Sequence, residues 1–449
     1  MKLIYQFNEG NKDMKDILGG KGANLAEMTS LGLNVPPGFT ISTTACRKYL
    51  EDNVLWLELK ETVLSNLRLL ELKTEKSFLG NRNLQPLLLS VRSGAPNSMP
   101  GMMDTILNLG LNDTSVKLMA DFTSNERFAY DSYRRFIEMF SNVVAEIPRI
   151  EFEKQLESVK IEKNYNSDSD LTISDLKLLI EKYKKIYFDF EKTEFPEDPT
   201  RQLFLAVEAV FRSWNNPRAI TYRNLHKISH DIGTAVNIQS MVFGNMGKTS
   251  GTGVLFSRNP INGNDELFGE YLMNAQGEDV VAGIRTPLEI SELNKEFPNI
   301  YKELFDTSKK LELYFKDIQD IEFTIENGKL YFLQVRNAKR TPLAAVNSAC
   351  EFVSEGLIDK KEAIKRISSK DIENLLHPVF DDAYLKKSKV VGKGLAASPG
   401  AASGKVYFSP ADVTIAKNKG EKVILVREET SPEDIEGMLY SEGILTSKG

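Results

Sequence analysis

The spacing of apolar residues changes several times along the chain. Up to about residue 110, short apolar runs alternate with glycine turns, which is typical of an α/β or α+β unit. From 112 to 230, apolar residues recur at helical spacing. One helix is predicted from 171 to 190, with Thr172 or Ser174 as its N-cap. The pattern therefore predicts a helical insertion within an α/β unit.

Strand patterns return after residue 230. Thr234 to Gln239 and Val254 to Phe256 are predicted strands on either side of a glycine-rich run, and Asp320 to Arg336 is a predicted hairpin. Residues 343–376 are amphipathic and helical, with a break at Gly356. We expect an α/β (α+β) multidomain protein in five parts, with boundaries at 1–111, 112–230 (helical insertion), 231–342, 343–393 (helical linker) and 394–449.

Length and charge narrow the class of protein. A chain of 449 residues is too long for one ordinary core. A net charge of −6 gives no electrostatic case for nucleic acid or an anionic membrane as the main partner. No stretch approaches the roughly 20 apolar residues that span a bilayer, and the N-terminus becomes polar too early for a signal peptide. We therefore expect a cytoplasmic protein. Because the net charge is negative, any phosphate site must depend on locally placed Lys and Arg.

Two short segments could supply such cations. Gly19 to Leu25 is a glycine-rich turn that carries Lys21 and leads into a helix, although it lacks the spacing of a Walker A loop. Taken alone, a capped surface turn is the favoured interpretation. Arg92 follows an apolar run, and a guanidinium at a strand end offers two donors to a phosphate. For the second segment taken alone, a strand with a surface arginine and a Met-lined core loop is the favoured interpretation.

The predicted hairpin places polar residues on one face of each strand. Asp320 and Glu322 share a face of the first strand, and Gln334 and Arg336 share a face of the second. If the two faces coincide, Glu322 and Gln334 offer the hard oxygen ligands that Mg²⁺ prefers. Arg336 could then neutralise charge on a transferring phosphate. A surface hairpin with ordinary charge pairs is the alternative.

The length of the hairpin loop decides whether these faces coincide. A two-residue Asn327-Gly328 loop pairs Glu326 with Lys329 and puts Glu322 and Gln334 on opposite faces. A three-residue loop with left-handed Gly328 pairs Ile325 with Lys329 and brings them together. Because a metal site needs this convergence, we predict the three-residue loop.

Together these segments resemble the nucleotide-binding half of pyruvate, phosphate dikinases. The likeness runs in order through nearly the whole chain, including Gly19 to Leu25, Ser90 to Thr105, Gly233 to Gly253, Asp317 to Thr341 and Leu395 to Gly404. It implies an ATP-grasp domain followed by a swivelling β/β/α phosphohistidine domain, of which 394–449 would be the first part. It also implies Mg²⁺ as cofactor and ATP and phosphate as ligands.

The resemblance assigns roles to individual residues. Lys21 and Arg92 would hold ATP phosphates, with Arg135 as a further candidate, and Glu322 and Gln334 would ligate Mg²⁺. The hinge strand that reads adenine would contain Gln239, Met241 and Val242, and the glycine loop that closes over the phosphates would contain Gly251, Thr252 and Gly253. Glu270 and Glu278 would contact the ribose or surround the metal. Asp320 would support the metal ligands, and Arg336 would touch the transferring phosphate.

The final residues limit the expected activity. Arg427 to Asp434 resembles the entry to the phosphohistidine loop, but no carrier histidine follows before Gly449. We therefore expect the chain to bind Mg·ATP without completing the dikinase reaction, since pyruvate or phosphoenolpyruvate would bind only a missing C-terminal barrel. The alternatives are a non-catalytic nucleotide-binding subunit that acts through a complementing chain or as a homo-oligomer, and a phosphotransferase or ligase with another acceptor.

Overall fold

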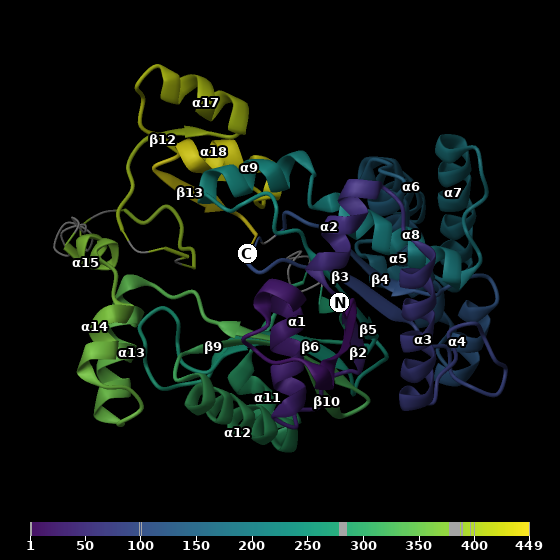
Figure 1. Cartoon of the computed structure of the whole chain (residues 1–449). Helices are drawn as coiled ribbons and strands as arrows, with labels where there is room; N and C mark the ends of the chain where they lie inside the picture. Colours follow the sequence, from purple (N-terminus) through teal and green to yellow (C-terminus); the bar gives the residue numbers. More distant parts are fainter. Residues whose placement is uncertain are drawn as a thin grey trace. The chain divides into compact units, whose positions relative to one another are not determined.

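The computed structural model describes residues 2–448 except 98, 100, 278–284, 377–386, 388, 396 and 399 (Figure 1). The chain divides into two compact units. Unit 1 comprises Met1–Ser250 and Tyr331–Gln334, and unit 2 comprises Gly251–Leu330 and Val335–Gly449. The α/β multidomain class is as expected, whereas the five predicted boundaries stay a prediction.

Unit 1 is built on a five-stranded sheet of order β1-β2-β5-β3-β4. Its strands are β1 (Ile4–Gln6), β2 (Gly38–Ile41), β3 (Leu89–Gly94), β4 (Thr105–Leu109) and β5 (Ala235–Ser240). The neighbours β2 and β5, and β5 and β3, pair antiparallel. The pairing places Thr40, Asn237, Arg92 and Thr105 in one row across four strands. Directly paired residues share a face, so these four side chains rise from the same side of the sheet.

The two faces of this sheet differ in chemistry. Val236 and Ile238 alternate with Asn237 and Gln239 along β5, and all four are buried. The apolar set joins a large core that includes Val91 and aromatic residues of the surrounding helices. The opposite face is therefore a buried polar surface, which an ordinary structural sheet would not need.

Nine helices in the described part of unit 1 surround this sheet. They are α1 (Lys15–Ser30), α2 (Thr43–Asp52), α3 (Leu57–Thr74), α4 (Ser115–Thr123), α5 (Glu126–Val144), α6 (Arg149–Lys163), α7 (Ile173–Glu191), α8 (Pro199–Ser213) and α9 (Pro217–His226). Residues 112–230, all of them described, contain helices and no strand, as the apolar spacing predicts. Thr172 caps α7 through a hydrogen bond from the N–H of Asp175, so Thr172 and not Ser174 is the N-cap.

A second antiparallel sheet has the order β10-β9-β6-β7-β8 and belongs to unit 2, apart from Tyr331–Gln334 of β10. Its strands are β6 (Gly251–Phe256), β7 (Phe268–Met273), β8 (Leu288–Glu289), β9 (Gln319–Glu326) and β10 (Lys329–Asn337). Two helices, α11 (Leu293–Glu296) and α12 (Pro298–Phe315), lie between β8 and β9 in the sequence and were not predicted. The predicted helical stretch contains α13 (Pro342–Ser354), α14 (Lys360–Arg366) and α15 (Ser369–Leu376). Gly356 has a left-handed φ of 76° and ends α13, as the predicted break requires.

The loop between β9 and β10 contradicts the prediction. The strands end at Glu326 and begin at Lys329, and Asn327 and Gly328 both have positive φ, 48° and 76°. Two left-handed residues define a two-residue type I′ turn. Asparagine and glycine are the residues that tolerate this geometry best, so local turn chemistry, and not the needs of a metal site, sets the loop length.

The last part of unit 2 is a small parallel sheet of order β11-β12-β13. Strands β11 (Lys405–Tyr407), β12 (Val423–Arg427) and β13 (Gly443–Thr446) alternate with helices α17 (Pro410–Asn418) and α18 (Ile435–Tyr440). Its core consists of Val413, Ala416, Val423 and Leu425. The assignment of 394–449 to a β/β/α carrier domain stays a prediction. Within the described ranges, none of the helices combines the length and apolar character that a membrane crossing requires.

Candidate functional site

Helix α1 is bent so that it brings Lys21 over the polar face of the unit-1 sheet. Gly19 interrupts the helix with φ 67° and ψ 168°. The N–H of Gly20 then donates to the carbonyl of Ala95 at 2.9 Å. A Cβ added at Gly94 would lie 3.6 Å from the Cβ of Lys21, so Lys21 sits directly above the end of β3.

Arg92 rises from the same face, two residues before Gly94 on β3. The two cations predicted from the sequence are therefore brought to one part of unit 1. The interpretation of Gly19 to Leu25 as a capped surface turn is wrong, because Gly19 and Gly22 are buried. A Cβ at Gly22 would lie 2.8–3.0 Å from side-chain atoms of Asn237 and Thr40. These glycines let the helix approach the sheet closely.

Arg135 is committed to a partner within the helical part of unit 1. Its Nε donates to Asp131 at 3.1 Å, and Arg134 binds the same carboxylate at 2.9 Å. Burial opposes ionisation of Asp131, but the charges of Arg134 and Arg135 hold the pKa of this carboxyl below its usual value. This network gives Arg135 a structural role, and its assignment to ATP stays a prediction.

The predicted hinge segment is only partly available for a ligand. The side chain of Gln239 donates to the carbonyl of Pro36 at 2.9 Å, and the N–H of Met241 donates to Leu88 at 2.8 Å. Val242 lies beyond the end of β5. The N–H of Met241 and one N–H of the Gln239 amide are therefore already used within the protein, and the assignment of this segment to adenine stays a prediction.

The predicted glycine loop is shorter than expected. Gly251, Thr252 and Gly253 belong to β6, which pairs with β7 on one side and β9 on the other. The hydroxyl of Thr252 donates to the carbonyl of Phe323 at 3.0 Å. Of the loop that the resemblance places at Gly247 to Gly253, only Gly247 to Ser250 lie outside β6. Gly253 is required by packing, since its Cβ would lie 2.6 Å from the carbonyl oxygen of Glu270.

Carboxylates gather on one face of the unit-2 sheet. Val254 pairs with Glu270 on β7 and with Glu322 on β9, so all three share a face. Desolvation raises the pKa of Glu270 above its usual value. Glu278, the other acidic residue assigned by the resemblance, lies outside the described residues.

Asp320 and Arg336 meet across the hairpin. The Nε of Arg336 donates to Asp320 at 2.6 Å, while the arginine side chain is 44% exposed. Burial raises the pKa of Asp320 despite the opposing charge of Arg336, and the neighbouring charge of Glu322 raises it further. Because one bond holds Nε, the guanidinium is oriented by a carboxylate that is itself buried.

This contact reveals an irregularity in the hairpin. A register kept unchanged from the two-residue turn would pair Asn337 with Ile318 and turn Arg336 away from Asp320. Instead, the N–H of Ala338 donates to the carbonyl of Ile318 at 2.9 Å. Gln334 and Val335 are both buried, which breaks the alternation along β10. A one-residue shift between the turn and Arg336 thus restores the convergence of Asp320 and Arg336 that the sequence predicts.

The candidate metal ligands are Glu322 and Gln334, and so small a set suits Mg²⁺ better than a metal ion that needs a full shell of protein ligands. Among the described residues, no three His, Cys, Asp or Glu side chains form a metal-binding group. Magnesium accepts one or two protein oxygens and completes its shell with water and phosphate. Glu322 and an amide oxygen from Gln334 would match that need. Burial raises the pKa of Cys46 to about 12, which keeps this thiol protonated at neutral pH.

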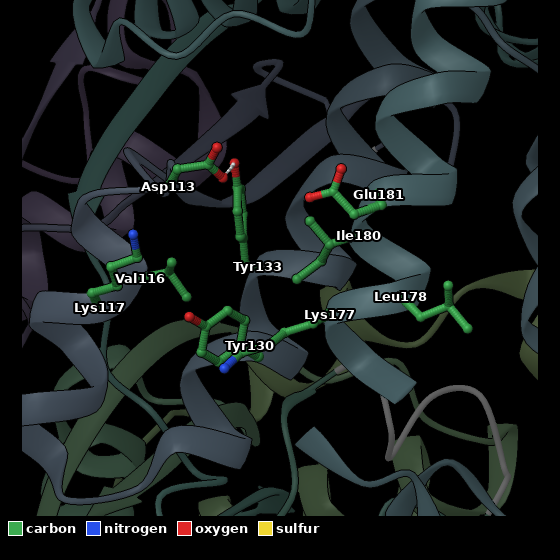
Figure 2. A pocket seen from close by; sticks show the side chains of 9 residues that line it. All are labelled: Asp113, Val116, Lys117, Tyr130, Tyr133, Lys177, Leu178, Ile180 and Glu181. Atoms are coloured by element: carbon green, nitrogen blue, oxygen red, sulfur yellow. Dashed lines mark hydrogen bonds between the residues drawn. The ribbon is translucent and has the colours of Figure 1, made fainter. Parts of the chain in front are cut away.

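A separate pocket lies in the helical part of unit 1 (Figure 2). It has a volume of about 390 Å³ and is lined by Asp113, Val116, Lys117, Tyr130, Tyr133, Lys177, Leu178, Ile180 and Glu181. None of the predicted site residues lines it. Its lining carries two lysines and two carboxylates, so its charge selects no particular ligand class.

Sequence reasoning missed Asn237 and Thr40 as members of the polar face. Thr40 donates its hydroxyl hydrogen to Oδ1 of Asn237 at 2.8 Å, and both side chains are buried. The alternation Val236-Asn237-Ile238-Gln239 contained the signal. When one face of a strand packs on an apolar core, polar residues on its other face can form a binding surface.

An ATP-grasp-type nucleotide-binding protein is the class that fits the matching family model, the cationic polar face of the first sheet and, taken separately, the acidic β9-β10 hairpin. The chain belongs to the family described as "Pyruvate phosphate dikinase, AMP/ATP-binding domain", which matches residues 15–78, 58–302 and 291–356. This is a family of kinase-type phosphotransferases.

Similar proteins support this assignment over the full chain. The chain is 56% identical to "Pyruvate, phosphate dikinase" of Clostridium symbiosum, with 100% of this chain and 51% of that protein covered. It is 54% identical to "Pyruvate, phosphate dikinase, chloroplastic" of Mesembryanthemum crystallinum, with 100% and 48% covered. The chain thus spans about half the length of the curated relatives it matches.

Proposed function

We propose that this chain is the nucleotide-donor part of a pyruvate, phosphate dikinase. It binds Mg·ATP and presents the phosphates to a carrier histidine on a segment outside this chain. In the complete reaction, ATP, pyruvate and phosphate give AMP, phosphoenolpyruvate and pyrophosphate. The observation that carries the proposal is the buried Asp320 holding Arg336 on the face of β9 that also carries Glu322, in a chain 56% identical to a dikinase.

The residues of unit 1 have a binding role in this proposal. Lys21 and Arg92 rise over the polar face of the sheet and attract the anionic phosphates. Lysine acts as a point charge, whereas arginine offers two parallel donors and fixes orientation. The bend at Gly19 sets the position of Lys21 relative to β3.

The residues of the β9-β10 hairpin handle the metal and the charge that develops during transfer. Glu322 and Gln334 are the proposed ligands of Mg²⁺, which when bound neutralises phosphate charge. Asp320 orients Arg336 through Nε, and among the described residues the terminal nitrogens of Arg336 form no other hydrogen bond. These nitrogens can donate to a phosphate oxygen as negative charge accumulates there.

Glu322→Gln should separate metal binding from nucleotide binding. The neutral amide is a poorer magnesium ligand, so we expect the gain in ATP affinity that Mg²⁺ produces to fall at least about tenfold. ATP affinity without Mg²⁺ should stay within about twofold, because the cations of unit 1 are untouched. Isothermal titration calorimetry with and without Mg²⁺ measures both values.

Asp306→Asn is the matched control, because Asp306 is exposed and pairs only with Lys302 among the described residues. It should leave both affinities unchanged. Failure of the unaltered chain to bind ATP would refute the proposed function. An unchanged magnesium dependence in Glu322→Gln would refute only the metal assignment.

A further inference from the structure

The side chain of Asn237 has an unsatisfied hydrogen-bond donor in the interior of unit 1. The residue is 1% exposed and lies in the middle of β5. Its Oδ1 accepts from the hydroxyl of Thr40 at 2.8 Å. Its Nδ2 has no acceptor among the residues that the structure describes. A buried donor without an acceptor is costly, and such a group in a native protein indicates a bound ligand or water.

A glycine packs closely against each end of this amide. A Cβ at Gly94 would lie 2.6 Å from Nδ2, and a Cβ at Gly22 would lie 2.8 Å from Oδ1. Neither glycine has a positive φ, so backbone conformation does not require glycine at either position. Their common feature is contact with Asn237. Any side chain at Gly94 would clash with Nδ2 and displace the amide.

The surroundings indicate which kind of acceptor Nδ2 would meet. Arg92 is the direct cross-strand partner of Asn237 and shares its face. Lys21 lies above Gly94, next to the unsatisfied donor. A ligand drawn by these two cations is anionic and rich in acceptor oxygens. The hydroxyl of Thr40 fixes the amide from below, so Nδ2 is held toward that ligand.

We propose that Asn237 is a phosphate-binding residue, whose Nδ2 donates to an oxygen of the nucleotide's phosphate chain between Lys21 and Arg92. This inference rests on the proposed function and adds a neutral, rigidly held donor to its two cations. A neutral donor that is already desolvated loses no further hydration when the phosphate arrives. It therefore contributes geometric selectivity where the cations contribute attraction.

Asn237→Leu removes the donor at similar volume, and Asn237→Asp replaces it with an acceptor of the same shape. We expect Kd for ATP to rise at least about tenfold in the first variant and further in the second, because a carboxylate repels phosphate. Kd for adenosine, which lacks phosphates, should change less than about twofold. Calorimetry for ATP and ligand-observed NMR for adenosine give the two constants, and urea unfolding confirms that each variant is folded.

Two further variants separate binding from structure. Gln202→Leu is the control, because Gln202 is a fully buried amide on α8 whose groups are all bonded. It should lower stability and leave the ratio of the ATP and adenosine constants unchanged. Thr40→Val should weaken ATP binding by releasing the amide, and Thr40→Ser should restore it.

The outcomes are distinguishable from those of the proposed function. If the unaltered chain binds no ATP, the proposed function fails, and this inference with it. If the unaltered chain binds ATP and both Asn237 variants keep that affinity, only this inference fails, and Nδ2 serves a buried water. Parallel loss of ATP and adenosine binding would also overturn it, because a phosphate contact cannot affect adenosine.

Discussion

Replacing Gly19 by alanine is expected to lower the free energy of unfolding by about 3 kcal/mol or more and to abolish ATP binding. Gly19 combines φ 67° with ψ 168°, a conformation that is essentially restricted to glycine. Its Cβ would also lie 1.7 Å from the carbonyl oxygen of Gly94, a backbone atom that no side-chain rotation can move. The start of α1 and the end of β3 would have to separate, and Lys21 would move away from Arg92.

Gly32→Ala provides the matched control. Gly32 follows the same helix and has φ 76°, but no atom lies within 4 Å of its added Cβ. Only backbone strain should remain there, about 1 kcal/mol, with no effect on ATP. Urea unfolding and calorimetry measure both quantities. Equal losses of stability in the two variants would show that the close approach to Gly94 is not the reason for glycine at position 19.

The secondary structure could be predicted largely from local patterns. Apolar spacing found the helices of 112–230, and Thr172 was identifiable as a cap because its hydroxyl and Asp175 form a short-range motif. Such features depend on residues three or four positions apart. The close packing of Gly22 against Thr40 and Asn237 joins segments far apart in the chain, and no local pattern specifies it.

The hairpin confirms that Asp320 and Arg336 meet and contradicts the loop length from which this was predicted. The sequence indicated that Asp320 and Arg336 meet, and they do. The loop chosen to explain this was wrong, since Asn327 and Gly328 form a two-residue turn. The register shifts further along β10, where both Gln334 and Val335 are buried. A bulge depends on packing against neighbouring strands, so turn residues alone could not predict it.

A second large effect is expected from Arg258→Met in unit 2. Arg258 is 2% exposed and binds Glu312 at 3.0 Å, Glu351 at 2.7 Å and Glu355 at 2.7 Å. It joins the end of β6 to α12 and α13 and lies over the ring of Phe352. Burial lowers its pKa, but the hydrogen bonds that it donates to Glu312 and Glu355 raise it above the ordinary value.

Removing this cation should lower the free energy of unfolding by about 3–5 kcal/mol, because the carboxylate of Glu312, only 2% exposed, would stay buried without its main partner. Ser257 and Lys309 still bind Glu312, at 2.7 Å and 3.3 Å, which places the expected loss toward the lower end of that range. Urea unfolding measures the loss. Arg149→Met is the control, because the side chain of Arg149 is 70% exposed in its pairs with Glu138 and Glu153. This replacement should lower the free energy of unfolding by less than about 1 kcal/mol.

The double variant Arg258→Met with Glu312→Met tests the cause. If the loss comes from an uncompensated buried carboxylate, removing the carboxylate as well should recover at least about half of it, because an apolar pair carries no desolvation penalty. If the loss comes instead from the contacts of Arg258 with α13, through Glu351 and Glu355, the double variant should be no more stable than Arg258→Met. A loss in Arg258→Met as small as that in Arg149→Met would mean that neither the buried charge nor the link to α13 contributes appreciably to the stability of unit 2.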